Sequence, residues 1–66
     1  MLLMAEEYEG WFINEETGQE INVQYSNKFV FITEYKDGHA VAKFIFDVTK
    51  RTPEYIVEFI KTYGVL

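Results

Sequence analysis

Residues 28–47, KFVFITEYKDGHAVAKFIFD, decide the fold because they contain two alternating strands joined by Asp37-Gly38. Asp-Gly between such strands is the strongest short-range signal for a β-hairpin, since both central residues of a type I′ turn need a positive φ. Counting outward from a two-residue loop predicts the cross-strand pairs. These pairs are Lys36–His39, Phe31–Phe44, Phe29–Phe46 and Lys28–Asp47. The register therefore predicts that the four phenylalanines share one face of the sheet.

A second hairpin is predicted before the first. Residues 8–14 and 19–25 alternate apolar with polar side chains around the loop EETG, in which Gly18 can supply a positive φ. A three-residue loop at 26–28 would join the two hairpins, because it keeps the aromatic residues of the third strand on the face of Val23 and Tyr25. This loop predicts that either Asn27 or Lys28 adopts a left-handed conformation.

A helix is predicted after the last strand. Thr52-Pro53-Glu54 supplies a cap residue, a first-turn proline and an acid, and Gly64 would end the helix. An apolar stripe follows at helical spacing. Its residues are Ile56, Phe59, Ile60 and Tyr63. The predicted fold is α+β, a four-stranded antiparallel meander of two β-hairpins with one C-terminal helix packed on one face. The alternative is a sheet that curls toward a small barrel.

Length and composition predict a single domain over residues 1–66 that lacks the usual stabilising devices of small proteins. The chain has no cysteine and one histidine, so neither a disulfide framework nor a thiolate or multi-histidine metal site is expected. His39 flanks the predicted turn, where an exposed turn residue is expected rather than a catalytic base. No cofactor and no enzymatic activity are predicted. Residues 1–7 are expected to be disordered or loosely packed, and Met4 is an alternative start.

The net charge is −5 and is unevenly distributed. Residues 1–25 contain six acids and no lysine or arginine. Nucleic-acid backbones and anionic membranes reward basic patches, so direct binding to either is not expected. The start MLLMA lacks a basic leader and is shorter than the apolar stretch of a secretory signal, so a cytoplasmic location is expected.

The second face of the predicted sheet is the candidate for function. The parity above turns the phenylalanines toward the helix and leaves an aliphatic patch uncovered, with polar and mostly acidic residues around it. The predicted interaction residues are Trp11, Ile13, Val30, Ile32, Val41 and Ile45. An apolar centre with a polar rim is the layout of a binding surface or a dimer interface, and Trp11 is the natural anchor.

These features predict a small acidic, non-enzymatic protein–protein interaction module that acts as a homodimer or as an adaptor. The alternative function is that of an inhibitor of the kind found in phages and mobile elements, which would imitate nucleic acid and occupy the basic groove of a DNA- or RNA-handling protein. The acidic surface expected to serve that function consists of Glu9, Glu15, Glu16, Glu20 and Glu34. The partner is therefore another, possibly basic, protein or a second copy of the chain.

Overall fold

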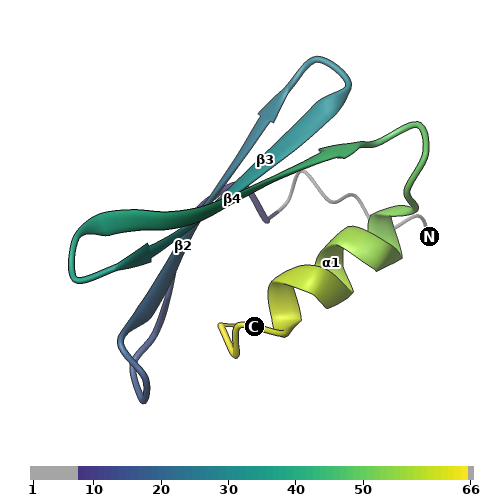
Figure 1. Cartoon of the computed structure of the whole chain (residues 1–66). Coiled ribbons are helices and arrows are strands. Elements are labelled where there is room, and N and C mark those ends of the chain that lie inside the picture. The colour runs from purple at the N-terminus through teal and green to yellow at the C-terminus, as the bar shows by residue number, and fades with distance from the viewer. Residues whose placement is uncertain (1–7, 66) are drawn as a thin grey trace.

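The fold is a four-stranded antiparallel sheet with one helix against one of its faces (Figure 1). It is seen in a computed structural model that describes residues 8–65. The elements are β1 (Gly10–Asn14), β2 (Gln19–Ser26), β3 (Phe29–Lys36), β4 (His39–Asp47) and α1 (Pro53–Lys61). The strands pair in the order β1-β2-β3-β4, so the predicted meander is confirmed and the sheet is not closed into a barrel. The predictions for residues 1–7 lie outside the described residues.

Two of the three turns follow the prediction. Asp37 and Gly38 both have positive φ, 53° and 81°, and Lys36 pairs with His39 across them. The loop at residues 15–18 joins β1 to β2, and Gly18 has a φ of 76°. In both places the backbone needs the left-handed region, which glycine reaches without steric cost.

The turn between β2 and β3 corrects the predicted register. It contains two residues, Asn27 and Lys28, rather than three, and Ser26 pairs with Phe29 across it. Asn27 has a φ of 59°, so the predicted left-handed conformation is confirmed at that position. Because side chains alternate with a period of two, the loss of one loop residue moves every side chain of β3 to the opposite face.

A β-bulge near the second turn corrects the pairing of β3 with β4. Tyr35 pairs with Ala40, whereas Glu34 pairs with Ala42, so Val41 has no directly opposed residue. From that point the register is shifted by one residue relative to the prediction. Bulges insert one unpaired residue into a strand and change the side-chain parity beyond it.

The turn and the bulge together divide the phenylalanines between the two faces. Phe44 pairs with Ile32 and Phe46 pairs with Val30, all on the face that contacts α1. Phe29 and Phe31 lie on the other face, where the prediction had placed the aliphatic residues. The prediction that all four phenylalanines share one face is therefore wrong.

The core lies between the sheet and α1 and is aliphatic. Its fully buried members are Ile21, Val23, Val30, Ile32, Ile56 and Ile60. Aromatic rings close one side of it: the ring centroid of Phe59 is 4.9 Å from that of Phe44 and 5.0 Å from that of Phe46. Both pairs have the edge-to-face geometry that aromatic quadrupoles favour. Val57 is also buried, although it lies outside the predicted helical stripe.

The ends of α1 follow from its capping residues. The hydroxyl of Thr52 accepts a hydrogen bond from Tyr55 N at 3.1 Å, and Pro53 occupies the first turn. At the other end the helix gives way to a turn that reaches Gly64, which has a φ of 70°. Asn14 Nδ2 donates to Tyr63 O at 3.0 Å, which ties the end of β1 to the end of the helix.

Candidate functional site

The surface of interest is the face of the sheet opposite α1, which we call the outer face. Strand register assigns its residues, because paired residues of neighbouring strands point to the same side. They are Trp11, Ile13, Glu20, Asn22, Gln24, Ser26, Phe29, Phe31, Thr33, Tyr35, Ala40, Lys43, Ile45 and Asp47. Val41 has no opposed residue at the bulge, and we assign it to this face because it follows Ala40 and is 55% exposed rather than packed against α1. No element among residues 8–65 covers this face, since the single helix packs on the other (Figure 1).

Large apolar side chains are exposed on both edge strands of the outer face. On β1 the exposed fractions are 62% for Trp11 and 53% for Ile13. On β4 they are 55% for Val41 and 57% for Ile45. A single exposed aliphatic residue is ordinary, but several on one face form a patch of the kind that marks an interaction site.

Aromatic residues connect the two edges. The ring centroids of Trp11 and Tyr35 lie 5.0 Å apart although the residues belong to β1 and β3, so the two rings meet over β2. The ammonium group of Lys43 lies 5.6 Å from the ring centroid of Phe31. These contacts hold the rings in place, and an ordered aromatic surface loses little conformational entropy when it binds.

The structure places only part of the predicted patch on this surface. Trp11, Ile13, Val41 and Ile45 are exposed on the outer face. Val30 and Ile32 are fully buried against the helix, so the prediction that they are exposed is wrong. The shorter β2–β3 turn is the reason, since it exchanges these two residues for aromatic ones.

Sequence reasoning missed the three aromatic members of β3 on the outer face, Phe29, Phe31 and Tyr35. All three had been assigned to the helix face by the three-residue loop. The signal that could have found them is Asn27, because asparagine tolerates the left-handed conformation that a two-residue hairpin turn requires. Starting that turn at Asn27 rather than at Ser26 places all three residues on the same face as Trp11.

The predicted acidic surface is spread over several parts of the molecule. Glu20 lies on the outer face and Glu34 on the helix face, while Glu15 and Glu16 occupy the β1–β2 loop. Glu9 Oε2 accepts a hydrogen bond from Tyr25 N at 3.1 Å. The five acids therefore do not form one continuous surface.

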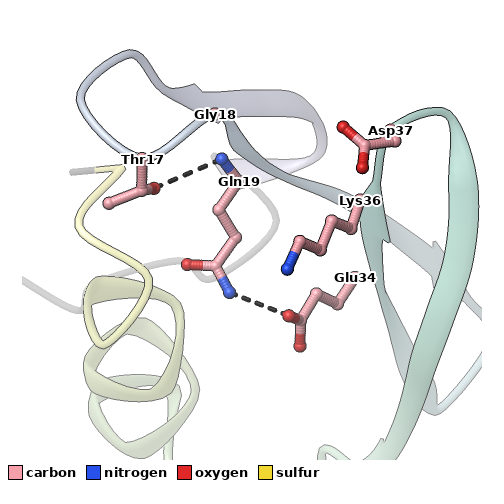
Figure 2. A pocket seen from close by; sticks show the side chains of 6 residues that line it. All are labelled: Thr17, Gly18, Gln19, Glu34, Lys36 and Asp37. Atoms are coloured by element: carbon pink, nitrogen blue, oxygen red, sulfur yellow. Dashed lines mark hydrogen bonds between the residues drawn. The ribbon is translucent and has the colours of Figure 1, made fainter.

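A small polar hollow lies at the end of the sheet near the β1–β2 loop, with a volume of about 270 Å³ (Figure 2). It is lined by Thr17, Gly18, Gln19, Glu34, Lys36 and Asp37. Two of its polar groups pair with each other, since Gln19 Nε2 donates to Glu34 Oε2 at 2.8 Å (Figure 2). Pockets that hold drug-sized ligands usually exceed about 300 Å³ and are mostly apolar, so this hollow is a weaker candidate than the outer face.

Two titratable groups, Tyr63 on the helix face and Asp47 on the outer face, have shifted pKa values. Burial raises the pKa of the Tyr63 phenol, and the negative charge of Glu34 and a hydrogen bond to that carboxylate raise it further. At the corner of the outer face, hydrogen bonds from the Thr49 hydroxyl and backbone N–H lower the pKa of Asp47. Asp47 therefore remains a carboxylate, and its Oδ1 is already engaged by Thr49.

No protein family, no curated protein and no solved structure matches this chain. Within residues 8–65 no three histidine, cysteine or acidic residues are grouped so that they could hold a metal ion. Over the same residues, no helix combines the length and the apolar character needed to cross a membrane.

Proposed function

We propose that this protein is a small interaction module that binds another polypeptide through the outer face of its sheet, and that it is not an enzyme. One observation supports the proposal above all others: four large apolar side chains, each more than half exposed, lie on a face that the described chain leaves uncovered. An antiparallel sheet with one face on a helix ordinarily presents polar residues on the other face. Here the outer face carries apolar side chains on both edge strands, aromatic side chains on β3 and polar side chains on β2.

The composition of the outer face is that of an interface. Tryptophan, tyrosine and phenylalanine are enriched at protein interfaces, and tryptophan and tyrosine are frequent hot spots. Trp11 and Tyr35 form one such pair, with Asn22 and Thr33 beside them as hydrogen-bonding groups. Trp11 is the expected anchor, because its ring removes about 150 to 250 Å² from water when it is buried.

Photo-cross-linking in the producing cells tests this proposal. A benzophenone amino acid replaces either Ile45 on the outer face or Tyr55 on the exposed side of α1, which are 57% and 43% exposed. We expect the Ile45 position to give discrete covalent adducts with protein and the Tyr55 position to give none. Adducts from Tyr55 alone, or from neither position, would contradict the proposal.

A further inference from the structure

We propose that the partner of the outer face is the outer face of a second copy of this chain. The inference rests on the proposed function, because it names the partner of the same surface. In the dimer, the two sheets pack face to face about a two-fold axis that runs parallel to the strands and passes between β2 and β3. Such an axis places β1 of one copy over β4 of the other and β2 over β3.

The first argument is a row of residues that crosses the sheet through its centre. Trp11 pairs with Asn22, Asn22 with Thr33, and Thr33 with Lys43. The two-fold axis reverses this row and lays it on itself. An indole then meets an ammonium group, which is a favourable cation–π pair, and the amide of Asn22 meets the hydroxyl of Thr33.

The neighbouring row is complementary in the same way. Ile13 pairs with Glu20, Glu20 with Tyr35, and Tyr35 with Ala40. When this row is reversed, Ile13 meets Ala40 and the adjacent Val41 of the second copy. The carboxylate of Glu20 meets the phenol of Tyr35, which can donate a hydrogen bond to it. Packed sheets cross at about 30°, so the central pairs of β2 and β3 are aligned best, while the edge pairs are offset and meet through the long side chains of Trp11 and Lys43.

Charge does not oppose this pairing, despite the net charge of −5 on each chain. The outer face contains three charged residues, Glu20, Lys43 and Asp47. The acids of the β1–β2 loop and of α1 lie away from it. Charges separated by more than about 8 Å are largely screened at physiological ionic strength, so these distant acids repel only weakly.

The available area predicts a weak dimer. A strand of eight residues is about 27 Å long and four strands span roughly 15 to 20 Å, so each copy can cover on the order of 500 Å² of the other. Stable interfaces cover about 800 Å² on each partner. We therefore expect the dimer to dissociate on dilution between ~1 mM and ~1 μM.

Trp11 makes the test direct, because it is the only tryptophan and its indole is exposed in the monomer. Sedimentation of the wild type over this concentration range should show conversion from monomer to dimer, with a blue shift of the tryptophan emission as the dimer forms. Isotope-filtered NOE spectra on mixed labelled and unlabelled chains should connect Trp11 to Lys43 of the other copy. A monomer throughout, or a dimer whose intermolecular contacts lie on α1, would overturn the inference.

Matched variants distinguish a loss of dimerisation caused at the outer face from one caused by added charge or polarity elsewhere. Val41→Lys should weaken the dimer at least tenfold, whereas Val48→Lys, at an exposed valine outside the outer face, should not. Lys43→Glu should also weaken it at least tenfold, whereas Lys61→Glu, on α1 and away from the outer face, changes the net charge equally and should leave it intact. A wild type that stays monomeric but still cross-links from Ile45 to a different protein would end this inference and leave the proposed function standing. Absence of any Ile45 adduct would end the proposed function itself.

Discussion

Both faces of the sheet carry large apolar side chains, but in opposite surroundings. On the helix face, Val30 and Ile32 are fully buried against Ile56 and Ile60. On the outer face, residues of comparable hydrophobicity such as Val41 and Ile45 remain more than half exposed. The difference is set by one helix, which is nine residues long and can cover one face only.

This contrast shows how a small domain can fold on one apolar surface and leave another exposed. Burial of the aliphatic core against α1 supplies the stability of the monomer, since each fully buried aliphatic side chain contributes about 1.5 to 3 kcal/mol. The outer face contributes little to that stability, because water still reaches its side chains. Its apolar area therefore remains available for association with another chain.

The largest expected difference in the free energy of unfolding is between isoleucine-to-alanine substitutions on the two faces. Ile32→Ala should lower the free energy of unfolding by about 2 to 5 kcal/mol, since it removes buried atoms and leaves a cavity. Ile45→Ala should change it by no more than about 0.5 kcal/mol at concentrations where the chain is monomeric. Urea unfolding followed by circular dichroism measures both values. Equal losses for the two variants would contradict the assignment of the faces.

Elements marked by specific residues were predictable from the sequence. Asp37-Gly38 located its hairpin turn and Thr52-Pro53 located the start of α1, because each pair has a conformational preference that few other residues share. The four strands and their order followed from these signals together with the alternation of side chains. The fold class therefore needed no long-range information.

The assignment of faces was not predictable from the alternation alone. In β3 both sets of alternate residues are apolar: Phe29 and Phe31 in one, Val30 and Ile32 in the other. Either set could pack against α1, so the length of the preceding turn decided between them. The bulge at Val41 then shifted the register of β4, and no residue pattern in that strand indicated it. The exposed residues Trp11, Ile13, Val41 and Ile45 were nevertheless predicted.

The turn that decides the faces gives the second prediction. Asn27 has a φ of 59°, which costs roughly 1 to 2 kcal/mol for a residue other than glycine, asparagine or aspartate. Asn27→Ala should therefore lower the free energy of unfolding by about 1 kcal/mol, and Asn27→Gly should preserve or raise it. Lys28→Ala, in the same turn but without a positive φ, is the matched control. If the alanine variants at 27 and 28 were equally stable, a turn with a different register would be indicated.

The smallest expected effect is a fall in stability at alkaline pH caused by Tyr63, which packs against the helix face of the sheet. The pKa of Tyr63 is raised above its ordinary value of 10.0, first by burial and then by Glu34, because both disfavour the phenolate. A group whose pKa is higher in the folded state stabilises the fold fully below pH 10 and loses this contribution as the pH rises through the folded value. Urea midpoints should therefore fall above pH 10 in the wild type.

Tyr63→Phe should reduce this fall, because phenylalanine has no proton to lose in the folded or in the unfolded state. The matched control is Tyr55→Phe, at an exposed position of α1 outside the core, which should leave the fall unchanged. Substitutions on the outer face such as Ile45→Ala should also leave it unchanged in the monomer, since Tyr63 packs against the opposite face. An alkaline fall that persisted in full in Tyr63→Phe would show that Tyr63 ionises as readily in the folded chain as in the unfolded one, and the end of the helix would then be open to solvent.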